Sequence, residues 1–300
     1  MTGCRSCCLS DKSIYISIAD ICVGLRVTDA NAREEIRNRY NNFLVRKTDA
    51  RDARPAVDIW VEVCESVQFL PPEKGPWVVK TFLRGSQLSI ISYTESGAVD
   101  LSKRSGRLIV ARQCKIENFL RALYSHLCIV GEALMFHASG VIKDGRGFIF
   151  CGRSGSGKTT IARLSTGYNV LSDDILIVKR AGSAYQLCGA PFHSDLPELP
   201  LCYRDDRAEL CAIFLPRKDT ANFIRLVGRA EAVAELISNV PFCTGSKETS
   251  ERIADLCADL AARVPVFKLH FRPEKEFWRA IDEAIEKVSP TSLTGGGASN

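Results

Sequence analysis

A glycine-rich segment followed by a lysine and two threonines is the clearest candidate for chemistry in this sequence. Residues 152–159 read G-x-x-x-x-G-K-T, the pattern of a loop that wraps a chain of phosphates. Glycine backbone can turn its N–H groups inward toward an anion, and a helix starting just after the loop directs its positive end there. The pattern therefore predicts a triphosphate site; the alternative is a glycine-rich turn that only resembles it.

Each residue of this segment has an expected task. Lys158 is predicted to reach the outer phosphates, and the hydroxyl of Thr159 to ligate Mg²⁺. The loop needs a strand before it, and residues 148–151 form a short apolar run suited to a buried strand. The residues expected to bind the phosphates are Gly152, Arg153, Ser154, Gly155, Ser156, Gly157, Lys158, Thr159 and Thr160.

Two adjacent carboxylates, Asp173 and Asp174, follow the loop and its short helix. They interrupt an apolar run over residues 168–178 that otherwise reads as β-strand. Burying two carboxylates in a sheet costs free energy unless a cation or a proton transfer uses them. The alternative is a plain β-turn, for which Ser-Asp-Asp is suitable.

A histidine, His137, is predicted to lie near the same loop. It belongs to an apolar stretch over residues 134–142, and the Asp144-Gly145 dipeptide that follows favours a β-hairpin. The strand that carries His137 should therefore pair with the strand leading into the loop. The alternative is a histidine that is simply packed within its strand.

The rest of the chain is read from its periodicity and its glycine and proline punctuation. Residues 13–112 look β-rich with one helix, residues 113–289 hold the motifs, and residues 1–12 and 290–300 are expected to be disordered. The expected helices cover residues 31–45, 115–132, 228–239 and 249–264, with another after Pro273, and the expected strands cover 13–28, 56–64, 77–83, 88–93, 107–111, 185–188, 210–215 and 267–271.

Composition narrows the class of protein. Of the 300 residues 46% are apolar and 25% charged, and the net charge of +5 suits an anionic ligand without demanding nucleic acid. No run is long enough for a membrane helix and no secretion signal is recognisable, so we expect a cytoplasmic protein whose thirteen cysteines are reduced. Cys4, Cys7 and Cys8 form either part of a zinc site or free thiols.

Three strings of residues together resemble a known family. They are H-A-S-G-V-I from His137, F-C-G-R-S-G-S-G-K-T-T from Phe150 and L-S-D-D from Leu171. They resemble the catalytic domain of HPr kinase/phosphorylase, and more closely the HPr-kinase-related proteins of peptide-tailoring gene clusters, such as lasso-peptide kinases. The resemblance implies a mixed α/β fold, with a P-loop domain like that of HPr kinase and phosphoenolpyruvate carboxykinase after a β-rich N-terminal region.

The resemblance also implies an activity. It implies an ATP- and Mg²⁺-dependent kinase that transfers the γ-phosphate to a hydroxyl, most often a serine of a peptide or protein. Carried over by residue, Asp173 would accept the proton of that hydroxyl and Asp174 would hold the metal. His137 would lie beside Asp173 and the γ-phosphate, while Lys158 would contact the phosphates. The related kinases often form symmetric assemblies, which is compatible with a homo-oligomer.

The sequence departs from the family at several positions. Thr160 stands where HPr kinases usually have glutamate, and Gly189-Ala-Pro-Phe stands roughly where they have Glu-x-Arg-Gly. Recognition of HPr and a reverse phosphorylase reaction therefore stay open, and so do two alternatives: a small-molecule kinase and a non-catalytic nucleotide-binding regulatory module. Arg204 and Arg207 either clamp the phosphates or form a solvated charge patch with neighbouring aspartates.

Overall fold

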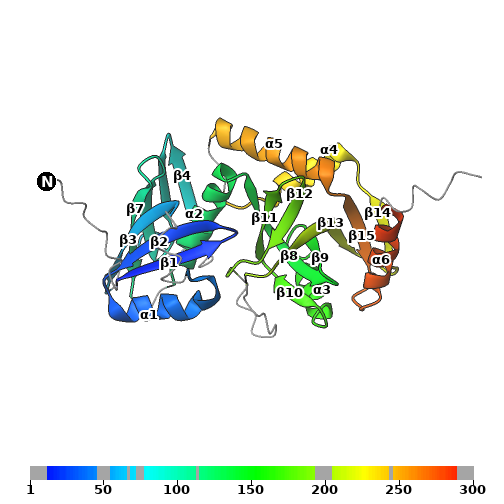
Figure 1. Ribbon diagram of the computed structural model, residues 1–300, viewed down its shortest axis with the longest axis horizontal. Coiled ribbons are helices and arrows are strands. Elements are labelled where there is room, and N and C mark those ends of the chain that lie inside the picture. Colours follow the sequence, from blue (N-terminus) through cyan, green and yellow to red (C-terminus); the bar gives the residue numbers. More distant parts are fainter. Residues whose placement is uncertain are drawn as a thin grey trace, which may run out of the picture. The chain divides into compact units, whose positions relative to one another are not determined.

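A computed structural model describes residues 12–45, 55–65, 68–71, 78–112, 115–192, 205–242 and 246–288. The chain divides into two compact units (Figure 1). The first unit holds Met1–Gly131 and Phe242–Ser250, and the second holds Glu132–Pro241 and Glu251–Asn300. The cysteine cluster near the N-terminus, Arg204 and the C-terminal tail lie outside the described residues.

The first unit is built on a mixed sheet of seven strands in the order β1-β2-β3-β7-β6-β5-β4. The pairs β2–β3 and β3–β7 are parallel and the other pairs antiparallel. The strands are β1 (Ser13–Ile18), β2 (Ile21–Val27), β3 (Val57–Cys64), β4 (Lys80–Arg84), β5 (Gln87–Ile91), β6 (Glu95–Asp100) and β7 (Ser105–Ala111).

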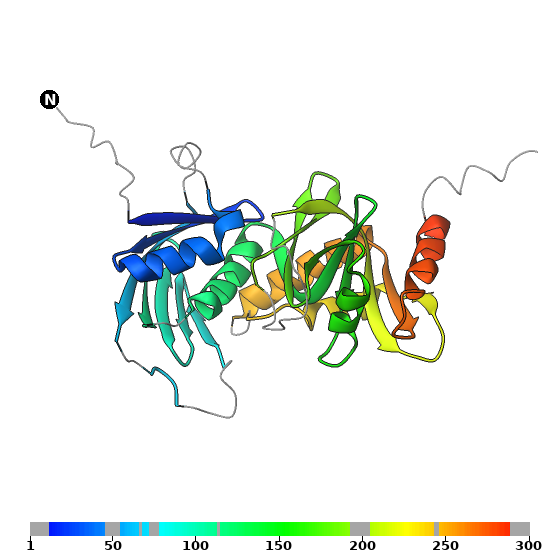
Figure 2. The same cartoon turned by 90° about the horizontal axis from the view of Figure 1, so that it is seen from below.

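Alternation along these strands decides which face of the sheet is buried. In β3, Val57, Ile59 and Val61 are fully buried while Trp60 is 49% exposed, as the two-residue period of a half-buried strand predicts. Helices α1 (Ala30–Arg39) and α2 (Glu117–Val130) pack against strands of this unit (Figure 2). The short 3₁₀ helix η1 (Asn41–Phe43) follows α1.

One predicted strand in this unit is in fact two. Residues 13–28 form a hairpin whose turn is Ala19-Asp20, both with positive φ. Such a turn normally carries asparagine, aspartate or glycine at both positions. Because Ala19 gives no such signal, the alternation of apolar and polar residues predicted one continuous strand. Strand β6 was also not predicted.

The second unit holds a mixed sheet whose main path runs β10-β8-β11-β12-β13-β15-β14, with β9 paired to both β8 and β13. The strands are β8 (Ala133–Lys143), β9 (Arg146–Cys151), β10 (Asn169–Ser172), β11 (Ile175–Ala181), β12 (Ala184–Cys188), β13 (Arg207–Lys218), β14 (Phe223–Leu226) and β15 (Val266–Phe271). Its helices are α3 (Lys158–Leu164), α4 (Arg229–Ile237), most of α5 (Lys247–Arg263) and α6 (Phe277–Val288).

The strand pairings of this unit close on themselves. β8 pairs with β11, β11 with β12, β12 with β13, β13 with β9, and β9 again with β8. The predicted hairpin is confirmed: β8 and β9 are antiparallel and joined by Asp144-Gly145, with φ of 52° and 74°. The strand that carries His137 therefore pairs with the strand that enters the glycine-rich segment.

An aromatic core fixes the position of that segment. Helix α6, predicted to start after Pro273, packs Phe277 and Trp278 against Phe148 and Phe150 of β9. The Trp278 Nε1–H donates to Ser165 Oγ at the end of α3, at 3.1 Å. The buried cluster joins β8, β9, β10, β13, β15, α3 and α6, and comprises Val141, Phe148, Phe150, Ile161, Ala162, Val170, Ala212, Phe214, Phe267, Leu269, Phe271, Phe277, Trp278, Ile281 and Ile285.

The fold is thus mixed α/β, as predicted. In the described residues we find no helix that is both long and apolar enough to cross a membrane.

Candidate phosphate site

The glycine-rich segment is a turn between a buried strand and a helix. β9 ends at Cys151 and α3 begins at Lys158, so residues 152–157 connect them. Gly155 and Gly157 have φ of 80° and 110°, which side chains other than glycine rarely adopt. A Cβ on Gly157 would also lie only 2.6 Å from Cζ of Phe271. The glycines are therefore required by the path of the backbone.

The lysine of the segment folds back onto the loop. The ammonium of Lys158 donates to the carbonyl of Gly152 at 2.6 Å and to that of Arg153 at 3.3 Å. Lys158 is 6% exposed, and burial lowers its pKa while the negative charge of Asp174 acts in the opposite direction. A buried cation at the mouth of a glycine loop favours an anionic ligand.

One hydroxyl inside the loop has no partner. Ser156 Oγ is inaccessible to solvent and makes no hydrogen bond in the described structure. A buried hydroxyl without a partner costs free energy, which an accepting ligand oxygen would recover. The donors available here are backbone amides, the Ser156 hydroxyl and the Lys158 ammonium, a set suited to phosphate oxygens.

The two aspartates lie in a bend between β10 and β11, the feature that the turn interpretation predicted. Ser172 Oγ accepts hydrogen bonds from the amides of Asp174 and Ile175, both at 3.1 Å. It donates to the carbonyl of Phe192 at 3.2 Å. Asp173 is only 3% exposed, so the bend does not simply place two carboxylates in solvent.

Strand register brings this bend to the loop. Ser172 pairs with Gly140 and Ile175 with His137. Counting inward, Asp173 stands opposite Ser139. Ser139 Oγ donates to the carbonyl of Lys158 at 3.2 Å, at the start of α3. The aspartates therefore occupy a strand position adjacent to the first turn of α3.

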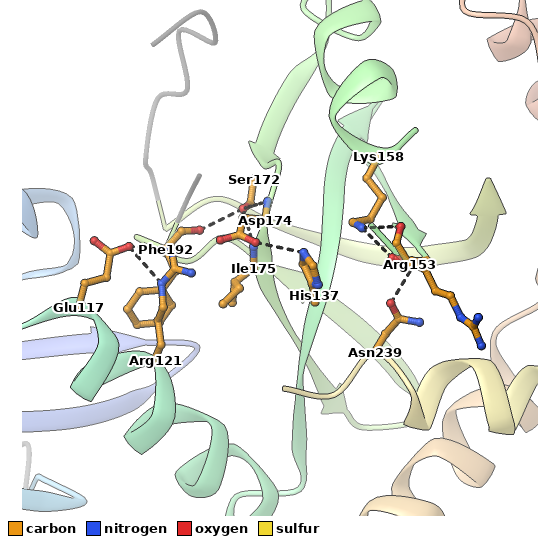
Figure 3. Close-up of polar contacts among 11 residues, drawn as sticks. Glu117, Arg121, His137, Arg153, Lys158, Ser172, Asp174, Ile175, Phe192 and Asn239 are labelled. Atoms are coloured by element: carbon orange, nitrogen blue, oxygen red, sulfur yellow. Dashed lines mark hydrogen bonds and ion pairs between the residues drawn. The ribbon is translucent and has the colours of Figure 1, made fainter. Parts of the chain in front are cut away.

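His137 contacts the second aspartate directly (Figure 3). Its Nε2 lies 3.3 Å from Asp174 Oδ1. The His137 side chain is 46% exposed and that of Asp174 18% exposed, so both remain open to a ligand. The structure thus brings together His137 and Asp174, and the charge of Asp174 opposes the effect of burial on the pKa of Lys158.

A residue that the sequence did not reveal joins these elements. Asn239 follows α4 and is 6% exposed. Its Oδ1 accepts from the Gly152 amide at 3.1 Å (Figure 3). Its backbone carbonyl accepts from the His137 amide at 2.8 Å. In sequence it reads only as a residue near the end of a helix, so no local signal pointed to it.

The groups that could hold a metal are few. Among the described residues no three His, Cys, Asp or Glu side chains gather in a cluster. Two ligands are expected from the sequence. Thr159 lies in the first turn of α3, and Asp174 lies in the bend after β10. Two such oxygen ligands suit Mg²⁺, which usually takes one or two carboxylates and completes its shell with water and phosphate oxygens.

The charge-patch interpretation is favoured for Arg207. Its Nη2 lies 2.7 Å from Asp205 Oδ2. It stands at the first residue of β13, whereas Phe214 further along β13 pairs with Phe150 near the loop. Because β9 and β13 are parallel, Arg207 lies toward the opposite end of the strands from the loop.

The second unit is therefore a mixed α/β unit with a strand, a glycine turn and a helix beside a buried aspartate bend. The model of the family described as SynChlorMet cassette protein ScmC matches residues 109–286, more than half of the chain. The chain belongs to this family.

The chain was also compared with solved structures and with curated proteins. A solved structure, the Hpr(Ser) kinase/phosphatase from Coxiella burnetii, is 12% identical in sequence. Its alignment covers 54% of this chain and 99% of that chain, with a TM-score of 0.33. No curated protein matches the chain.

Proposed function

We propose that this protein is an ATP- and Mg²⁺-dependent kinase that transfers the γ-phosphoryl group to a hydroxyl, and that this hydroxyl belongs to a serine of a peptide or protein. One observation carries the proposal. A glycine loop with a buried lysine lies next to a strand bend with a buried aspartate, within a single sheet. Phosphoryl transfer needs positioning and neutralisation of charge more than covalent chemistry, so this combination is sufficient.

The loop would bind the phosphates. Backbone amides of residues 153–159 other than that of Ser156, which donates to the Arg153 carbonyl, supply donors together with the Ser156 hydroxyl. The ammonium of Lys158 supplies charge. Lys158 would exchange its contacts with the Gly152 and Arg153 carbonyls for the outer phosphate oxygens. Thr159 and Asp174 would hold Mg²⁺, which neutralises charge on the phosphates when bound.

Asp173 would act as the base. Its carboxylate accepts the proton of the acceptor hydroxyl as the hydroxyl oxygen forms a bond to the γ-phosphorus. The bond between that phosphorus and the β–γ bridging oxygen breaks, and ADP leaves. His137 would orient the reacting groups, because it is half exposed and already contacts Asp174.

The identity of the acceptor hydroxyl is inferred from the resemblance to known kinases. The resemblance of His137-Ala-Ser-Gly-Val-Ile and Leu171-Ser-Asp-Asp to kinases of peptide-tailoring clusters supports a serine in a peptide or protein. The description of the family as a cassette protein is compatible with such a setting.

The test is transfer of label from γ-³²P-ATP in the presence of Mg²⁺. The purified chain is incubated with serine-containing peptides, with hydroxylated metabolites and with cell extract. Label in a peptide or protein serine supports the proposal. Label only in a metabolite would replace it with a small-molecule kinase, and ATP binding without any labelled product would replace it with a regulatory module.

A further inference from the structure

The β8–β9 ladder ends at the candidate site. Its last pair is Ala138 with Cys151. In the same register the next pair would be His137 with Gly152, but these two residues do not pair. The strands separate there, and Gly152 begins the loop.

Asn239 takes up the hydrogen bonds at this point of separation. Its side-chain Oδ1 accepts from the amide of Gly152, and its backbone carbonyl accepts from the amide of His137. Gly152 then has its carbonyl available for the Lys158 ammonium, at 2.6 Å. One residue thus contacts both strands where they part.

Asn239 is itself held firmly. Its Nδ2 donates to the carbonyl of Glu235 at 2.8 Å and to Ser238 Oγ at 3.3 Å. Its amide donates to the carbonyl of Leu236 at 3.0 Å. These bonds tie it to the last turn of α4 and fix the orientation of its amide group.

We propose that Asn239 is a positioning residue that keeps β8 and β9 apart at His137 and Gly152, and so sets the distance between the histidine and the phosphate loop. The effect of Asn239 on catalysis rests on the proposed function. Its effect on the separation of β8 and β9 does not. Without the Asn239 side chain, the Gly152 amide loses its acceptor, and the first residue of the loop is no longer bonded to α4.

Two substitutions separate the hydrogen bond from other effects. Asn239→Leu removes the acceptor for Gly152 and leaves the backbone carbonyl that serves His137. Asn239→Asp keeps Oδ1 as an acceptor, loses the donation to the Glu235 carbonyl, and adds a negative charge beside the phosphate site. Asn222→Leu is the matched control, because Asn222 Oδ1 also accepts a backbone amide of this unit, that of Arg272 at 2.8 Å.

The first measurement is NMR-detected amide hydrogen exchange on the full chain without nucleotide. We expect Asn239→Leu to speed exchange at Gly152 about tenfold or more while His137 stays protected, and Asn239→Asp to restore protection at Gly152. Asn222→Leu should affect Arg272 and not Gly152. Unchanged exchange at Gly152 in Asn239→Leu would overturn the inference.

The second measurement is steady-state kinetics with ATP, corrected for the fraction of folded protein. We expect Asn239→Leu to raise the KM for ATP about tenfold and to lower kcat as well, because the loop shifts relative to the phosphates and to His137, which keeps its own backbone bond. A lower apparent kcat with unchanged KM would indicate a merely structural role and contradict the inference. If the unsubstituted chain transfers no phosphate, the proposed function fails while the exchange experiment still decides the geometry.

Discussion

The two units of the chain differ in where their buried polar side chains lie. In the first unit most of them lie on α2 or bond to it: Glu95 accepts from the amide of Phe119, and the Tyr124 hydroxyl of α2 donates to the carbonyl of Ile16. In the second unit most of them gather where β8 and β9 separate. That second group comprises Ser139, Lys158, Ser172, Asp173 and Asn239.

Two buried carboxylates make the contrast specific. Glu95 is 1% exposed and caps the start of α2, a structural task that explains its burial. Asp173 is 3% exposed and lies in a bend opposite Ser139, beside the start of α3. The comparison teaches that burial of an acidic side chain does not by itself indicate function, because Glu95 is buried for a structural reason.

The largest effect is expected at Asp173. Asp173→Asn keeps the shape of the side chain and removes the base, so transfer should fall by about 10²-fold or more while ATP binding is retained. Rates of label transfer and equilibrium ATP binding check this. Asp144→Asn, in the exposed hairpin turn, is the control. Full activity of Asp173→Asn would mean that the base assignment is wrong.

The second-largest loss of activity is expected at Lys158. Lys158→Ala removes a charged donor to the phosphates and the two bonds that shape the loop entrance, so we expect kcat/KM for ATP to fall about tenfold to a hundredfold. Kinetics and ATP titration measure it, with the exposed Lys275→Ala as control. Equal losses in both lysine variants would argue against a specific role in binding phosphate.

A smaller loss is expected at His137. His137→Asn leaves the backbone bond to Asn239 and removes the contact with Asp174, so kcat should fall about tenfold with little change in the KM for ATP. His270→Asn is matched to it, because His270 also contacts an aspartate, Asp219, at 2.8 Å. A wild-type kcat for His137→Asn would favour the packed-histidine alternative.

The smallest effect belongs to the first unit and concerns stability. Burial raises the pKa of Glu95 from 4.5 to about 8. Between these values the folded protein keeps a proton that the unfolded chain releases, so the free energy of unfolding should fall as pH rises from 4.5 to 8. Glu95→Gln should flatten this dependence in urea unfolding at pH 5, 6.5 and 8. The same slope in both proteins would contradict it.

Much of this arrangement could be predicted, and the reasons differ by element. The strand before Gly152, the helix at Lys158 and the hairpin at Asp144-Gly145 follow from local backbone requirements, so the sequence carries them. Strands β6 and β14 have weak periodicity and were not predicted. Asn239 could not be found at all, because its role depends on contacts with Gly152 and His137, which are distant in sequence.

The two aspartates also show which features are set by local sequence and which by long-range contacts. The turn at Asp173-Asp174, which the sequence analysis gave as the alternative, is present as a bend. Its nearness to α3 comes from the pairing of β10 and β11 with β8, a long-range property that periodicity does not encode. The catalytic roles of Asp173, His137 and Lys158 and the metal role of Asp174 stay predictions.

The central claim is that a nucleotide's phosphates occupy the loop and face the aspartate bend. A crystal structure of the chain with Mg²⁺ and a non-hydrolysable ATP analogue tests it most directly. The account predicts the terminal phosphate within hydrogen-bond distance of the Lys158 ammonium, with the metal ligated by Thr159 and Asp174. A nucleotide bound elsewhere, or a terminal phosphate on the side of the loop away from Asp173, would contradict it.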